Sequence, residues 1–427
     1  MEKTRSMWLK DPRIQRQYNL FCHGKLNDPF PLFHRLQRED PVHWSVVLES
    51  WLVTRYDDVT SAFLDPRLSA RRVPIFMSQI PEPVRTRVKP LAEHFEKWLG
   101  MTDPPDHTRL RTLIGRAFTP KSIEGMRGRI QEVVNDLLDD FCRKKQIDFV
   151  AEFAHRLPAT VICEMLGIPT EDEDRFQEQV KGIMDFLGGA GPSLVRTVES
   201  SQVSLFESLE YFRALISERR RNPKSDLISA MVSVDEQDDC FTEDELIAMC
   251  IFLFFAGFET TQSLISNGLL ALFQFPDAHQ QLRNDLSLMP RAVEEFLRFY
   301  SPLQRQTRVA TEEIKMHGRT IFKGQAVLLM QGAANRDPVQ FEDPDRIDIS
   351  RYPNRHVAFG LGSHFCLGAP LARLEGEIAF EAILLRFPAL RIPVPLENLE
   401  WEESMSFLTL KSLPLILSYD KGWCLGS

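Results

Sequence analysis

The amino-acid sequence predicts a mainly α-helical protein with small β-sheets, an α+β fold. Helical patterns are long, whereas strand patterns are short and few. The strand patterns lie at 42–47, 51–54 and 314–330. The chain has 427 residues, of which 43% are hydrophobic and 26% charged, enough to bury a sizeable core. Since no repeat or composition break divides it, we expect residues 1–427 to form a single domain.

The longest expected helix begins after Thr242. Thr242 and Glu245 have the spacing of a capping box, and Pro276 stops the helical pattern. About 30 residues of helix would be roughly 50 Å long. Because the segment is apolar nearly all round, we expect a central, buried helix. In its middle, 256–261 reads Ala-Gly-Phe-Glu-Thr-Thr and brings polar groups into this apolar stretch.

One cysteine lies in a glycine-rich loop, Phe-Gly-Leu-Gly-Ser-His-Phe-Cys-Leu-Gly, at 359–368. The glycines permit unusual backbone angles and close approaches. Backbone N–H groups turned toward the sulfur of Cys366, and the start of a helix after Pro370, would stabilise its thiolate. Such a cysteine suits an iron centre, although an isolated cysteine is more often a small buried hydrophobe.

Net charge, cysteine content and the lengths of apolar runs exclude several classes of protein. A net charge of −9 argues against general nucleic-acid binding. Seven cysteines, odd in number and without a Cys-x-x-Cys pair, indicate neither a disulfide framework nor a structural zinc site, so a reducing cytoplasm fits best. The start of the chain lacks the apolar core of a signal peptide. The longest apolar run, 246–258, has 13 residues against roughly 20 needed to span a bilayer.

The glycine-rich loop resembles the haem-binding signature of the cytochrome P-450 family, Phe-Gly-x-Gly-x-His-x-Cys-x-Gly, at every fixed position. The resemblance implies the cytochrome P-450 fold, with haem b between the long central helix and the cysteine loop. It makes Cys366 the axial ligand of the iron, where a thiolate favours cleavage of the O–O bond. It also assigns Phe359, Gly360 and Gly368 to cofactor binding.

The segment 256–261 resembles the family's oxygen-activating motif, Ala-Gly-x-Glu/Asp-Thr-Thr. By that resemblance, Ala256 and Gly257 leave room for dioxygen, Thr260 holds bound oxygen and water, and Glu259 helps to relay protons. From the residues alone, a local kink with back-bonded threonines explains the segment equally well.

Haem carries two propionates, which need cationic or hydrogen-bonding partners. Four residues match family positions that reach them: His107, Arg111, Arg308 and His364. Any one of these alone would more often be a solvated charge.

Glu295 and Arg298 lie three residues apart on one expected helix. An exposed pair of this kind contributes little to stability. The resemblance implies instead a buried structural pair that braces the segment before the cysteine loop, joined by Arg351 or Arg355.

Apolar residues in segments that face the distal side of the haem in the family indicate a hydrophobic substrate. These are Phe76, Leu187, Phe252, Leu253, Leu303 and Phe407. Each could equally belong to the core. The few obvious cations in these segments weakly disfavour strongly anionic substrates.

The resemblance implies a haem-thiolate monooxygenase that hydroxylates or epoxidises a hydrophobic small molecule. The sequence has neither clustered cysteines nor a Gly-x-Gly-x-x-Gly turn, so we expect no fused flavin or iron-sulfur segment. Electrons would come from a separate ferredoxin or flavodoxin-type donor, docked on a surface with Arg109, Arg116 and Arg373, although ordinary helix solvation explains these arginines equally well. We expect a monomer. The alternatives are a peroxide-driven enzyme on the same scaffold, a non-catalytic haem protein that binds a gas, and a haem-free protein that keeps only the fold.

Overall fold

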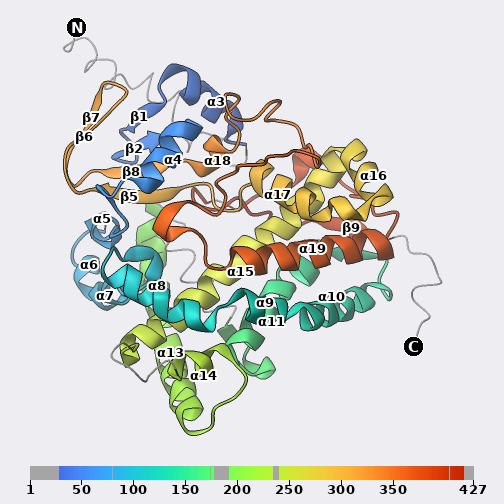
Figure 1. Cartoon of the computed structure of the whole chain (residues 1–427), viewed down its shortest axis with the longest axis horizontal. Coiled ribbons are helices and arrows are strands. Elements are labelled where there is room, and N and C mark those ends of the chain that lie inside the picture. Colours follow the sequence, from blue (N-terminus) through green and yellow to red (C-terminus); the bar gives the residue numbers. More distant parts are fainter. Residues whose placement is uncertain are drawn as a thin grey trace.

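The computed structural model describes residues 28–78, 80–173, 175–176, 192–233, 240–402 and 404–417. It confirms a mainly helical protein with small sheets, in which helices form most of the body and the largest sheet lies at one side (Figure 1). In the first half of the chain the described helices are α3 (Phe30–Glu39), α4 (Tyr56–Leu64), α5 (Val73–Ser78), α6 (Val84–Arg87), α7 (Lys89–Phe95), α8 (Asp106–Ala117), α9 (Pro120–Glu124), α10 (Arg127–Phe141), α11 (Arg156–Leu166) and α13 (Pro192–Arg221). They are followed by α14 (Leu227–Val232), α15 (Glu243–Gln274), α16 (Pro276–Asn284), α17 (Met289–Phe299), α18 (Gln331–Ala334) and α19 (Ala369–Arg386).

The largest sheet has five strands in the order β1-β2-β8-β5-β3. Its strands are β1 (Val42–Ser45), β2 (Ser50–Val53), β3 (Leu68–Ser69), β5 (Gln306–Ala310) and β8 (Ala326–Leu329). The strands β2 and β8 run parallel, with Ser50 opposite Ala326, and the other neighbours are antiparallel. Two-stranded sheets pair β4 (Gln146–Asp148) with β9 (Pro414–Ile416) and β6 (Ile314–Met316) with β7 (Arg319–Ile321). The strand patterns at 42–47, 51–54 and 314–330 therefore predicted real strands, but β3 and β5 showed no comparable pattern.

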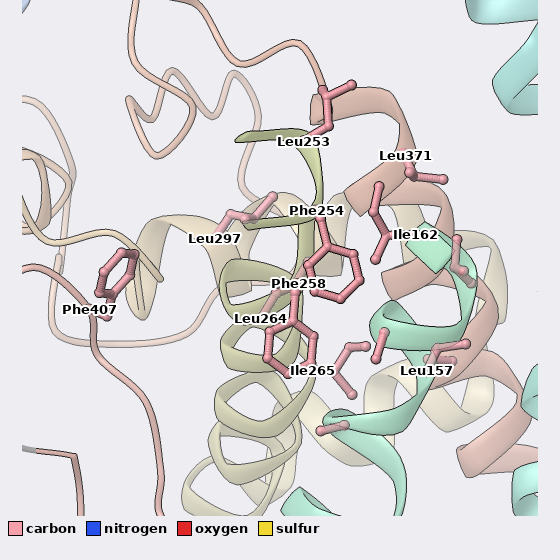
Figure 2. Packing of buried hydrophobic residues seen from close by; sticks show 14 of the residues in the cluster. Leu157, Ile162, Leu253, Phe254, Phe258, Leu264, Ile265, Leu297, Leu371 and Phe407 are labelled. Carbon is pink, nitrogen blue, oxygen red and sulfur yellow. The ribbon is translucent and has the colours of Figure 1, made fainter. Parts of the chain in front are cut away.

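The helix α15 crosses the molecule as the sequence predicts. Its capping box is formed, because Glu245 N donates to Thr242 Oγ1 at 3.2 Å and Thr242 N donates to Glu245 Oε2 at 2.9 Å. It contacts α11, α13, α17 and α19. Figure 2 shows Phe254 and Phe258 of α15 on the side that faces Ile162 and Leu157 of α11. Among the described residues, α15 is the one helix long and apolar enough to cross a membrane, and 67% of that apolar window is buried inside the protein, as in a core helix.

Glu295 and Arg298 are both fully buried in α17. Two hydrogen bonds of 2.8 Å join the guanidinium to the carboxylate. Of the two arginines proposed to join them, Arg351 does so, with its Nε 3.2 Å from Glu295 Oε2, and Asn354 donates to the same oxygen at 3.1 Å. Arg355 instead offers its carbonyl to the Tyr56 hydroxyl.

One expectation about the cysteines is wrong. Cys142, which follows α10, is disulfide-bonded, whereas Cys163, Cys240, Cys250 and Cys366 are free. The spacing of cysteines along a sequence reveals local metal or redox motifs. It does not reveal two cysteines that the fold brings within bonding distance.

Candidate active site

The loop before α19 holds the sulfur of Cys366 as the sequence predicts. Gly360 and Gly362 have φ of 68° and 71°, a region that glycine adopts without strain. Cys366 N donates to Phe359 O at 2.9 Å, which closes the loop. Gly368 is different, because its φ is −81° and an added Cβ would lie 4.0 Å from the sulfur, an ordinary contact. Its small size is therefore not required by the protein around it.

The charge of the sulfur is set by opposing effects. Burial raises the pKa of the Cys366 thiol, and it is opposed by the N–H of Gly368, the cations Arg111 and Arg373, and the N–H of Ala369. Two N–H groups at the start of α19 therefore point their positive ends at the sulfur. Such an environment suits a thiolate that binds a metal ion.

A cavity of about 310 Å³ opens beside the sulfur. Its wall includes Cys366 and Phe359 from the loop and Ala256, Gly257 and Thr260 from α15. Five of the predicted pocket residues also line it: Phe76, Phe252, Leu253, Leu303 and Phe407. The sixth, Leu187, lies outside the described residues. Gly360 and Glu259 are absent from the wall, so Gly360 shapes the loop and Glu259 lies one position away from the cavity-facing Thr260.

The polar segment of α15 has hydroxyls that bond back to the helix, as its sequence predicts, and it also lines the cavity. Thr260 Oγ1 donates to Ala256 O at 3.0 Å, and Ser263 Oγ donates to Glu259 O at 2.9 Å, so hydroxyls do bond back to the helix. Thr260 nevertheless lines the cavity together with Gly257. A Cβ on Gly257 would lie 3.2 Å from Ile162 Cδ1, so this glycine also permits the close approach of α11.

Three of the four predicted propionate partners line the cavity: His107, Arg111 and His364. The ring centres of His107 and His364 lie 4.0 Å apart, and neither nitrogen of the buried His107 has a hydrogen-bond partner among the residues that the structure describes. Burial, with Arg308 next, lowers the pKa of His364 to about 3. Arg308 lies behind the wall, and its Nη2 donates to the side chain of Gln306 at 3.1 Å.

These residues fit a cofactor with a metal and carboxylate groups. Buried nitrogens without partners are rare in folded proteins, so those of His107 indicate a group that this structure does not include. Arg111 and the two histidines could bind carboxylates, and Cys366 could bind iron. The donor set is therefore that of a haem with a thiolate ligand.

Two arginines of the cavity wall, Arg72 and Arg305, escaped the sequence analysis. Burial, and then the nearby charges of Arg308 and Arg305, lower the pKa of Arg72 to about 9. Its Nη1 donates to Gly100 O at 2.5 Å and Ala70 O at 3.2 Å. The expectation of a pocket with few cations is therefore wrong. In an extended segment alternate side chains share a face, so the spacing of Arg305 from Leu303 was the signal that could have found it.

The arginines proposed for partner docking are mostly engaged within the chain. Arg109 pairs with Glu245, and Arg373 pairs with Glu294 at 2.5 Å. Burial raises the pKa of Glu294, but hydrogen bonds from His356 and Arg373 outweigh it and lower that pKa to about 2. Arg116 is exposed at the end of α8.

Comparison with known proteins identifies one family. The family model for cytochrome P450 matches residues 77–416. The polyketide biosynthesis cytochrome P450 PksS of Bacillus subtilis is 38% identical over 406 residues, which cover 93% of this chain and 98% of PksS. The 6-deoxyerythronolide B hydroxylase of Saccharopolyspora erythraea is 37% identical over 383 residues, which cover 86% of this chain and 90% of that enzyme.

Solved structures share the whole fold. P450BioI, in complex with an acyl carrier protein ligated to hexadec-9Z-enoic acid, has a TM-score of 0.84 and 34% identity and covers 92% of this chain and 99% of its own. A myxobacterial cytochrome P450 in complex with myristic acid has a TM-score of 0.84 and 37% identity, with coverage of 94% and 99%. The chain therefore belongs to the cytochrome P450 family and is a monooxygenase, an oxidoreductase that incorporates one oxygen atom of O2 into its substrate.

Proposed function

We propose that the protein is a haem-thiolate monooxygenase that uses dioxygen and two electrons from a separate redox partner to hydroxylate or epoxidise a small organic molecule. Cys366 is the axial ligand of haem b in this proposal. The observation that carries it is that Cys366 and Thr260, from two segments far apart in the sequence, line one cavity. When bound, the haem supplies the chemistry that activates O2.

The residues around the cavity have distinct tasks in this proposal. His107, Arg111 and His364 bind the propionates and so fix the cofactor in the cavity, and Arg308 supports them from behind through Gln306. The small residues Ala256 and Gly257 leave space beside α15. The Thr260 hydroxyl, bonded to Ala256 O, holds water at the cavity and passes protons, and Glu259 next to it supplies them.

The test is Thr260→Ala in the haem-loaded enzyme with a ferredoxin, its reductase and a substrate. Proton delivery contributes about 100-fold or more to such steps, so we expect product per electron pair to fall at least tenfold while electron consumption continues. Thr260→Ser, which keeps the hydroxyl, is the matched control and should retain coupling. A peroxide-driven enzyme would turn over with hydrogen peroxide alone and lose little in Thr260→Ala, and a gas-binding protein would show no turnover with any donor.

The electron donor in this proposal is an acidic ferredoxin or flavodoxin-type protein. Opposite charges speed and orient such encounters. Of the arginines predicted for this surface, Arg116 is exposed, whereas Arg109 and Arg373 already pair with carboxylates. Arg116 should therefore carry the larger share of the attraction. The single-domain organisation, the monomeric state and the cytoplasmic location stay predictions.

A further inference from the structure

Arg305 is a buried cation for which the fold provides almost no partner. Its side chain lines the cavity, and the residue is 9% exposed. Its one hydrogen bond within the described part of the chain runs from Nη1 to Thr307 Oγ1 at 3.3 Å, and its Nε has no partner. A guanidinium has five N–H donors. Most of that capacity is therefore unused within the described part of the chain.

Two other buried arginines, Arg298 and Arg336, each have a carboxylate partner, whereas the hydrogen bonds of Arg308 within the described residues go to Thr307 O and the side chain of Gln306. Arg298 binds the carboxylate of Glu295 and donates to three backbone carbonyls, those of Asn335, Pro344 and Arg346. Arg336 donates to Asp345 and to Phe299 O. A buried charge is strongly unfavourable unless it is paired. The contrast indicates that Arg305 is paired by something that enters the cavity.

The anionic groups near the cavity act on other arginines and not on Arg305. Four arginines lie in or directly behind the wall: Arg72, Arg111, Arg305 and Arg308. Asp103 acts on Arg72 and Arg308 but not on Arg305. Burial raises the pKa of Glu375, also in the wall, to about 8, so it is uncharged at pH 7. Cys366 acts on Arg111, so Arg305 is the one of these four arginines on which no anionic group in the described part of the chain acts.

We propose that Arg305 binds the carboxylate of the substrate, which makes the substrate an organic acid with an apolar body. This inference rests on the proposed function and names its substrate class. The apolar body fits the remainder of the wall, since Phe76, Phe252 and Leu303 line the same cavity. The carboxylate meets the guanidinium in a low-dielectric site, where a charge-assisted hydrogen bond is strongest.

The test compares acids with neutral ligands of the same length in the haem-loaded protein at pH 7, where the acids are ionised and Glu375 is uncharged. The probes are octanoic, dodecanoic and tetradecanoic acids, with the methyl ester and the primary alcohol of each. Dissociation constants come from the shift of the Soret band and, independently of spin state, from calorimetry. The wild type should bind at least one acid ten-fold or more tighter than its ester and alcohol. The ester also stands in for an acyl chain on a carrier protein, which lacks a free carboxylate.

Substitution then assigns the preference to Arg305. Loss of one partner of a buried charge pair weakens binding by about 30-fold or more, so Arg305→Gln should weaken the acid by that factor and the alcohol less than three-fold. Arg305→Lys should recover part of the acid affinity. Arg283→Gln, a surface change whose native guanidinium donates to Pro388 O, is the control and should leave both unchanged.

Three results would overturn the proposal. Esters that bind as tightly as acids to the wild type would mean that the substrate does not need a carboxylate. An equal loss of acid and alcohol affinity in Arg305→Gln would reduce the arginine to a packing role. A lower haem content with unchanged acid affinity per haem would assign Arg305 to a propionate. In each case a normal thiolate-haem spectrum and coupled turnover leave the proposed function standing, whereas protein that cannot bind haem removes both.

Discussion

The buried carboxylate of Glu295 permits a sharp test of what holds the segment before the cysteine loop. Every group that points at it is a donor: the Arg298 guanidinium, the N–H of Asp348, the Nε of Arg351 and the Nδ2 of Asn354. In Glu295→Gln, the new NH2 must replace one of the two oxygens. Because Arg298 donates to both oxygens, no orientation of the amide avoids placing the NH2 against donors.

The expected cost follows from these contacts. At least two buried donors lose their acceptor, at about 1–3 kcal/mol each, and the buried Arg298 loses its counter-charge. Breaking a buried pair from one side costs about 3–5 kcal/mol, which is a large part of the 5–15 kcal/mol that stabilises a typical protein. We therefore expect Glu295→Gln to lower the free energy of unfolding by about 3–5 kcal/mol.

The assay is guanidinium unfolding followed by far-UV circular dichroism, at equal haem content because a bound cofactor adds stability. The matched control is Glu164→Gln. Glu164 also binds an arginine through both oxygens, with Arg129 Nη2 at 2.7 Å, but at the surface. Surface pairs contribute about 1 kcal/mol or less. Equal costs for the two variants, or a cost below 1 kcal/mol for Glu295→Gln, would refute the reasoning.

Two further predictions concern the core. Burial lowers the pKa of His94 to about 3, so the folded protein keeps it neutral while the unfolded chain, at about 6.5, takes up a proton. Because of this residue, the free energy of unfolding should fall by about 1.4 kcal/mol per pH unit from pH 6.5 toward 3. His94→Leu should therefore flatten the dependence of the unfolding midpoint on pH between 5 and 7. An unchanged slope in this variant would contradict the prediction. A Cβ on Gly268 would lie 2.4 Å from Phe380 Cζ. Gly268→Ala should therefore overpack the core and lower the free energy of unfolding by about 1–3 kcal/mol. A melting temperature equal to that of the wild type would show that the ring moves aside freely.

Local signals in the sequence predicted the parts of this protein that depend on local geometry. The capping box at Thr242 fixed the start of α15, and the glycine spacing around Cys366 predicted a loop whose φ angles are positive at Gly360 and Gly362. Both are decided within a few residues of chain. Resemblance to a family brought distant positions such as His107 and His364 into one site, and their rings do lie in contact.

The sequence could not predict contacts between side chains that lie far apart along the chain. Arg351 and Arg355 are both arginines in one short segment, so the sequence does not distinguish them. Only the path of the loop turns Arg351 toward Glu295. The spacing of Arg305 from Leu303 could have placed it at the cavity, but only the fold shows that it is buried there without a carboxylate partner among the described residues. The disulfide at Cys142 likewise depends on where the chain returns. Each of these contacts depends on segments that lie far apart along the chain, so a short sequence pattern does not reveal it.

The parallel pairing of β2 with β8 has a consequence for how the protein is made. Ser50 and its partner Ala326 are 276 residues apart along the chain. At a synthesis rate of about 5–20 residues per second, the ribosome makes β2 roughly 14–55 s before it makes β8. Throughout that interval one edge of β2 lacks its partner, and an open strand edge invites pairing with other chains. Since Cys366 is made later still and forms part of the cavity wall, the cavity cannot be complete before Cys366 has been made, and the cofactor can be enclosed only after that point.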